Sequence, residues 1–163
     1  MKPISSSIST SIKGSVAIPG DKSISHRSLI ISSLAIGKTT INGILKGKDI
    51  ISTKIALEKM GVNIYEKEDN FEVCGVGSGG LLEPNDILDL GNSGTSARLL
   101  IGLISSHKMT ATLTGDASLR KRPMKRVTEH LVRIGANIAL KKELFPPIKI
   151  KGTGKNGIIL NMK

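Results

Sequence analysis

Three stretches of this sequence place cations beside small polar residues where a helix is expected to start. The first is Lys22-Ser23 with Arg27, which follows the turn pair Pro19-Gly20. Asp21 and Ser23 are both residue types that cap helices. A helix start exposes free N–H groups and the positive end of the helix dipole, so it suits an anion, and nearby cations strengthen this. A capped helix with two solvated cations explains the stretch equally well.

The other two stretches lie further along the chain. Gly91-Asn92-Ser93-Gly94-Thr95 contains small residues whose backbone can approach a ligand closely, and Arg98 follows one turn later. Arg120-Lys121-Arg122 precedes Pro123, which suits the first position of a helix. Cations at a helix start oppose the dipole, so an acid such as Asp116 or a bound anion must offset them. Each stretch alone has a structural explanation, but three together favour a site for a small polyanion.

The net charge of +11, from 24 Lys and Arg against 13 Asp and Glu, raises the question of nucleic-acid binding. The chain has one Tyr, two Phe and no Trp, so platforms for stacking bases are scarce. The cations are mostly scattered, with one dense cluster from Arg120 to Arg126. A small, highly anionic substrate explains a local cluster equally well, and we expect neither a nucleic-acid nor a membrane partner.

Composition narrows the class of protein further. With 163 residues, 39% of them apolar, the chain is long enough for one domain with a hydrophobic core. No run is long enough to span a membrane and the start lacks a signal-peptide core, so we expect a cytoplasmic protein. No metal-binding spacing of Cys and His and no P-loop occurs, so no metal or cofactor is expected. His26 lies near the first helix start, but a partly buried structural histidine is the commoner case and we assign it no role.

The pattern of apolar residues predicts one order of elements twice. The first copy has a strand within residues 4–18, a helix over 23–36, a strand over 38–44, a helix over 49–60, and a hairpin of 62–65 and 70–74. The second has a helix over 97–105, a strand over 109–115, a helix from Arg122-Pro123 to 134, and a hairpin of 137–140 and 148–152.

Local sequence matches support this duplication. Met60-Gly61-Val62-Asn63-Ile64 is similar to Ile134-Gly135-Ala136-Asn137-Ile138, which lies 74 positions later. We therefore predict an α/β fold of two βαβαββ-like units, at about residues 14–80 and 81–154, with a stub at 155–163.

At this point three motifs carry a family resemblance. They run from Pro19 to Arg27, from Gly91 to Thr95 and from Leu119 to Met124, in this order. Together they resemble the amino-terminal portion of the 3-phosphoshikimate 1-carboxyvinyltransferase (EPSP synthase) family. The related UDP-N-acetylglucosamine enolpyruvyl transferases fit less well, because they carry Lys-Asn where this chain has Lys22-Ser23.

The resemblance implies a transferase of the shikimate pathway, which leads to chorismate and the aromatic amino acids. The enolpyruvyl group of phosphoenolpyruvate would move to the 5-hydroxyl of shikimate 3-phosphate, with loss of phosphate and without a cofactor. By the same resemblance Lys22 assists catalysis and contacts both substrates, while Ser23 and Arg27 bind the shikimate ester. Gly94 and Arg122 would contact phosphoenolpyruvate, and glyphosate would pack at Gly94. Residues of second rank, which shape the loop, are Asn92, Thr95 and Arg98.

The family also implies a larger protein than this chain. Its members have two domains of three units each, with substrates bound between them. We therefore expect residues 1–13 to form a strand that pairs with a second domain, residues 14–163 to be an incomplete amino-terminal domain, and the chain alone to show no turnover. The alternatives are a non-catalytic anion-binding fragment or one half of a split enzyme, and, less favoured, a basic nucleic-acid-binding domain.

Overall fold

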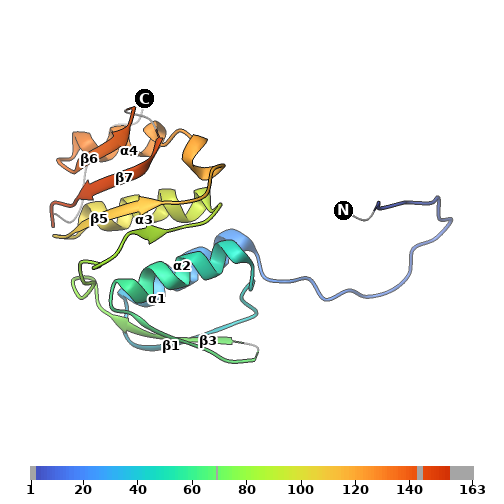
Figure 1. The fold of residues 1–163 in the computed structure, drawn as a ribbon. Helices are drawn as coiled ribbons and strands as arrows, with labels where there is room; N and C mark the ends of the chain where they lie inside the picture. Colours follow the sequence, from blue (N-terminus) through green and yellow to red (C-terminus); the bar gives the residue numbers. More distant parts are fainter. Residues whose placement is uncertain (1–2, 69, 143–144, 155–163) are drawn as a thin grey trace.

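The computed structural model describes residues 3–68, 70–142 and 145–154. The first half of the chain forms a three-stranded antiparallel sheet with the strand order β1-β3-β2. Helices α1 and α2 pack on one face of this sheet, on the side of the second half of the chain (Figure 1). The elements are α1 (Lys22–Leu34), β1 (Ile36–Asn42), α2 (Lys48–Lys59), β2 (Asn63–Glu66) and β3 (Asn70–Val76).

The second half of the chain repeats this arrangement. Its sheet has the order β4-β5-β7-β6, in which β4 runs parallel to β5 and the other pairs are antiparallel. A short 3-10 turn, η1, connects β5 to the last helix. The elements are β4 (Leu88–Asp89), α3 (Gly94–Ser106), β5 (Thr110–Thr114), η1 (Leu119–Lys121), α4 (Lys125–Arg133), β6 (Asn137–Lys141) and β7 (Phe145–Lys151).

The two sheets share one pairing scheme. In each, the strand after the first helix pairs antiparallel with the last strand, so that Lys38 lies opposite Cys74 and Thr110 lies opposite Lys151. The predicted α/β fold class of two βαβαββ-like units is therefore confirmed. Among the described residues, only the second unit has its leading strand, β4, whose two residues are too few to show a periodicity in sequence. The predicted stub at 155–163 lies outside the described residues.

The strand predicted within residues 4–18 is wrong. Residues 3–20 form no helix or strand and run away from the rest of the chain (Figure 1). Ile12, Val16 and Ile18 are 94%, 81% and 83% exposed. A strand needs a neighbour to take up its backbone hydrogen bonds, and no described strand lies beside this segment. As a result β1 keeps a free outer edge, whereas β4 covers the equivalent edge of β5.

The helix predicted to start near Arg122-Pro123 is present, but α4 begins slightly later, at Lys125, so the placement of Pro123 at its first position is wrong. The preceding residues close a 3-10 turn, in which the N–H of Arg122 donates to the carbonyl of Leu119 over 2.9 Å. Met124 then takes the N-cap position, so Pro123 is not the first residue of the helix. The two cations that oppose the helix dipole are therefore Lys125 and Arg126 in the first turn of α4. Both are exposed, so solvent screens this repulsion.

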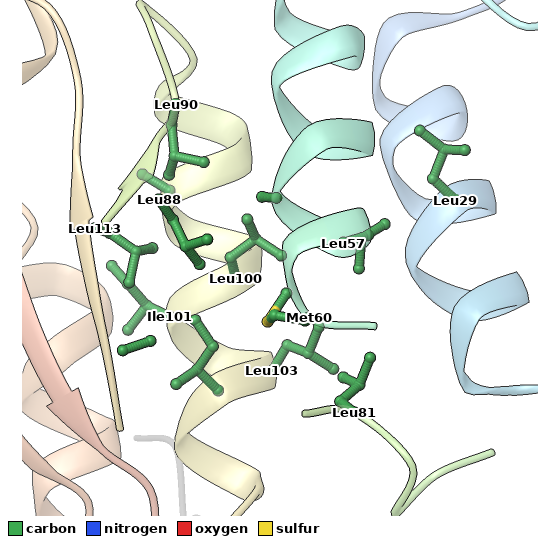
Figure 2. Close-up of a cluster of buried hydrophobic side chains, with 14 of the residues drawn as sticks. Leu29, Leu57, Met60, Leu81, Leu88, Leu90, Leu100, Ile101, Leu103 and Leu113 are labelled. Atoms are coloured by element: carbon green, nitrogen blue, oxygen red, sulfur yellow. The ribbon is translucent and has the colours of Figure 1, made fainter. Parts of the chain in front are cut away.

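One hydrophobic core joins the two units. Figure 2 shows Met60 of α2 on the side of Leu100 and Leu103 of α3, whereas Leu57 of α2 lies on the side of Leu29 of α1. Leucines from β4 and β5 close the other end of the same cluster. Burial of apolar area is the main stabilising contribution to such a core, so neither unit keeps its full stability without its neighbour. In the described part of the chain, no helix is long and apolar enough to cross a membrane.

Truncation of one core residue tests this packing. Leu29 is fully buried, whereas Ile31 on the same helix is 66% exposed. We expect Leu29→Ala to lower the free energy of unfolding by about 2–5 kcal/mol, because it removes buried methyl groups and leaves a cavity. Ile31→Ala, the matched control, should change it by about 0.5 kcal/mol or less. Urea denaturation followed by circular dichroism measures both, and equal effects would contradict the assignment of the core.

Candidate anion-binding site

The start of α1 is capped by Asp21 and not by Ser23. The N–H of Ile24 donates to the Asp21 carboxylate over 2.7 Å. The hydroxyl of Ser25 donates to the Asp21 carbonyl over 2.7 Å and accepts from the N–H of Leu45 over 3.0 Å. These bonds attach the first turn of α1 to the loop after β1. The cap therefore fixes the direction in which the first side chains of the helix point.

Lys22 forms an ion pair with Asp49, which lies in the first turn of α2. The Lys22 side chain is 50% exposed and that of Asp49 is 25% exposed, so the ammonium group still reaches solvent. The carboxylate offsets a cation that stands at the positive end of α1. Sequence reasoning missed Asp49, since an acid near a helix start is common and nothing in its spacing connects it with Lys22.

Ser23 and Arg27 are exposed on the same first turns of α1. Within the described residues, neither side chain makes a hydrogen bond or an ion pair. Arg27 lines a groove between α1 and the free edge of β1, together with Ser28 and the strand residues 39–42. The donors of this guanidinium are therefore available to a ligand.

The start of α3 is capped by Ser93, as its position in the predicted motif implied. The N–H of Ser96 donates to the Ser93 hydroxyl over 3.2 Å. Gly91 just before it has φ +54°, a conformation that glycine adopts without strain, and its N–H donates to Asp89 over 2.9 Å. The loop therefore turns sharply and presents its backbone at the helix start.

A network of hydrogen bonds connects this helix start with the basic cluster. Asn92 donates to Asp116 over 2.8 Å and accepts from the guanidinium of Arg122 over 2.5 Å. Asp116 also accepts from the N–H of Leu119 over 2.7 Å, which holds η1 in place. The hydrogen bonds from Asn92 and the backbone, with the charge of Arg122, hold the pKa of Asp116 below its ordinary value of 3.8. Asp116 therefore offsets the cations as a carboxylate.

Two guanidinium groups flank Gly94. Arg98 donates to the carbonyl of Gly94 over 3.1 Å and to that of Pro123 over 3.4 Å. A Cβ atom at position 94 would lie 2.9 Å from an Nη1 atom of both Arg98 and Arg122. The glycine thus leaves open the space in which both cations and the N-terminal N–H groups of α3 converge. Such a place suits a phosphate or a carboxylate.

The two helix starts lie next to each other across α2. The carbonyl of Asp49, whose carboxylate pairs with Lys22, accepts from the Ser96 hydroxyl over 3.3 Å. Lys22, Arg122 and Gly94 therefore lie at one end of the packed helices. Of the second-rank residues, Asn92 and Arg98 make the bonds described above, whereas Thr95 is half-buried and forms none among the described residues. No group of three or more His, Cys, Asp or Glu in the described part could hold a metal ion.

Most of this chain is similar to known proteins of one family. Residues 7–163 match the family model described as EPSP synthase (3-phosphoshikimate 1-carboxyvinyltransferase). The 3-phosphoshikimate 1-carboxyvinyltransferase of Rhodospirillum rubrum is 49% identical over 157 residues, and that of Sphingopyxis alaskensis is 53% identical over 138 residues. The crystal structure of EPSP synthase from Acinetobacter baumannii superposes with a TM-score of 0.82 at 44% identity over 85% of this chain.

These matches cover most of this chain and a minor part of each relative. The two sequences align with 93% and 84% of this chain but with 35% and 31% of their own length. The Acinetobacter baumannii structure is covered over 32% of its chain. This chain therefore spans about a third of the length of the relatives it matches.

Removing the charge of Asp116 tests the network around Arg122. We expect Asp116→Asn to lower the melting temperature at pH 7, because the cations lose their nearest carboxylate. The carboxyl has a lowered pKa in the folded state, so its contribution is complete above pH 3.8 and is lost as the pH falls through the folded-state pKa. Differential scanning calorimetry from pH 7 to pH 3 should show the two proteins converging at acid pH.

Asp86→Asn is the matched control, because Asp86 is exposed and lies 3.6 Å from Lys59. Its melting temperature should stay close to that of the unchanged protein throughout the range. Equal melting temperatures of Asp116→Asn and the unchanged protein at pH 7 would contradict the proposed role of the carboxylate.

Proposed function

The chain belongs to the EPSP synthase family, and we propose that its basic helix starts form one wall of a site that transfers the enolpyruvyl group of phosphoenolpyruvate to shikimate 3-phosphate. The observation that carries the proposal is the convergence of Lys22, Arg122 and Gly94 at one end of the helices. Both substrates are anions, and the described residues around this end offer more cations than carboxylates. The products would be 5-enolpyruvylshikimate 3-phosphate and phosphate.

In this proposal Ser23 and Arg27 bind the phosphate ester of shikimate. Both side chains are exposed, and their donors have no partner in the part of the chain that the structure describes. A guanidinium and a hydroxyl at a helix start match the geometry of phosphate oxygens. The short distance along α1 between them and Lys22 would place the cyclohexene ring of shikimate beside the ammonium group.

Phosphoenolpyruvate would bind where Arg122 and Gly94 meet. Arg122 is held by Asn92 over 2.5 Å, so its guanidinium is positioned before the ligand arrives. Lys22 would stand between both substrates. Its ammonium group would stabilise negative charge on the 5-oxygen of shikimate 3-phosphate, which forms a bond to the enolpyruvyl carbon, and on the phosphate that leaves this carbon. Its ion pair with Asp49 holds the ammonium group at the helix start, and ligand binding would draw it from the carboxylate. Asn92, Thr95 and Arg98 would shape the loop.

The same proposal gives a role to the amino-terminal segment, which pairs with no described strand. Residues 1–13 would form a strand with a second domain, and residues 14–163 would be part of the amino-terminal domain. Support comes from Ile4, Ile8 and Ile12, which are 99%, 101% and 94% exposed and so have no packing partner among the described residues. That second domain would supply the opposite wall of the site. We therefore expect the chain alone to bind shikimate 3-phosphate weakly and to produce no detectable product.

Isothermal titration with shikimate 3-phosphate tests the proposed binding wall. We expect Arg27→Ala and Lys22→Ala each to weaken binding about tenfold, because each removes a charge-assisted hydrogen bond of about 1.5–3 kcal/mol. Lys108→Ala is the control with the same change in charge, since Lys108 is exposed beyond the opposite end of α3. Equal loss in all three variants would indicate non-specific attraction. Salt-sensitive binding of DNA without any response to the ester would favour a nucleic-acid-binding domain.

A methyl group at Gly94 tests the phosphoenolpyruvate position. In Gly94→Ala the new Cβ meets the flexible ends of Arg98 and Arg122, so we expect stability to change by about 1 kcal/mol or less. The displaced guanidinium groups and the filled space should weaken phosphoenolpyruvate and exclude glyphosate, while shikimate 3-phosphate keeps its affinity. Titration of the three ligands against both proteins measures this. An equal loss for all three would place Gly94 outside the phosphoenolpyruvate position.

A further inference from the structure

A chain of buried polar side chains crosses the three helices behind the site. Nδ1 of His26 on α1 lies 2.8 Å from the hydroxyl of Thr53 on α2. That hydroxyl lies 2.7 Å from the hydroxyl of Ser96 on α3, which in turn lies 2.6 Å from the hydroxyl of Ser93. All four residues are fully buried. The hydrogen bonds span separations of 27 and 43 residues, so they form only when the helices are packed.

The bond lengths and the buried nitrogen indicate which group donates and which accepts in each of these hydrogen bonds. Nε2 of His26 has no partner among the described residues. A buried N–H without an acceptor is rarer and less favourable than a lone pair without a donor, so the proton resides on Nδ1. His26 then donates to Thr53, Thr53 to Ser96 and Ser96 to Ser93. The competing acceptor of both hydroxyls, the carbonyl of Asp49, is more distant at 3.3 Å.

The imidazole is neutral in this arrangement. Burial lowers the pKa of His26, the charge of Lys22 lowers it further, and Asp49 opposes both. The neutral ring can keep one nitrogen as a donor and leave the other bare, whereas a cationic ring would bury a second N–H without an acceptor. All hydrogen bonds of the series from His26 to Ser93 are therefore formed at neutral pH.

Both ends of this series of hydrogen bonds, His26 and Ser93, lie at the proposed binding wall. His26 directly precedes Arg27, and Ser93 is the N-cap residue directly before Gly94. Apolar side chains could pack three helices without the cost of burying four polar groups. They would not specify the axial position of one helix against another, since apolar contacts have no direction, whereas a linear series of hydrogen bonds does.

We propose that His26, Thr53, Ser96 and Ser93 are positioning residues, which hold the starts of α1 and α3 at the spacing that anion binding requires. The part of this inference that concerns ligand affinity rests on the proposed function. The part that concerns the helices does not, because it is measurable without a ligand.

Thr53 offers the sharpest test, because Val has nearly its shape and Ser keeps its hydroxyl. We expect Thr53→Val to weaken shikimate 3-phosphate binding about fivefold to tenfold, since one buried hydrogen bond is worth about 1 kcal/mol, and Thr53→Ser to restore it. His26→Asn should also keep most of the affinity, as an amide nitrogen can occupy the position of Nδ1, whereas His26→Leu should not. The matched control is Ser105→Ala on α3, the helix of Ser96, which removes a buried hydroxyl without a partner among the described residues.

The backbone amide of Gly94 reports on the helices without a ligand. In ¹H–¹⁵N correlation spectra we expect Thr53→Val to shift this resonance, Thr53→Ser to return it, and Ser105→Ala to leave it unchanged. If the unchanged protein fails to bind shikimate 3-phosphate, the proposed function is wrong, and the Gly94 amide still decides the positioning role. Native affinity in Thr53→Val, or a Gly94 resonance that Thr53→Val leaves in place, would overturn the inference.

Discussion

The site depends first on Asp49, because this residue contacts both helices that carry the basic residues. Its carboxylate pairs with Lys22 at the start of α1, and its carbonyl accepts from Ser96 in the first turn of α3. Both contacts exist only because α2 is packed between α1 and α3 by the shared hydrophobic core (Figure 2). Apolar packing therefore sets the distance between the helices, and polar contacts at one end define which residues face each other.

Charge at this end is balanced locally and not by the chain as a whole. The net charge of +11 makes the folded state repel itself, so each cation near the site needs a compensating partner. Asp49 forms an ion pair with Lys22, and Asp116 is connected to Arg122 by hydrogen bonds through Asn92. Arg27 has no such partner among the described residues, which agrees with a side chain whose counter-ion is a ligand. A bound anion would therefore neutralise the positive charge of Arg27, which no described carboxylate offsets.

The elements were predictable where a local signal exists. Capping residues, apolar runs and glycine at helix ends placed α1, α2, α3 and both hairpins close to their observed bounds. The strand expected near Val16 failed because alternation shows only that a segment can pair, while pairing needs a neighbour. Pro123 misled in another way, since a proline suits both a helix start and the turn before one, and the 3-10 turn at Leu119–Lys121 took precedence.

The sequence by itself determined the family, because Lys22, Arg27, Gly94 and Arg122 stand in three motifs whose residue types and order identify it. It also determined the repeat, since both units keep one order of elements. Only the tertiary structure decided that Lys22 pairs with Asp49, that Arg122 is held by Asn92, and that His26 is the buried end of a hydrogen-bond chain. These contacts join residues 27 to 43 positions apart, and no local pattern encodes such separations, because they arise when the hydrophobic core brings the helices together.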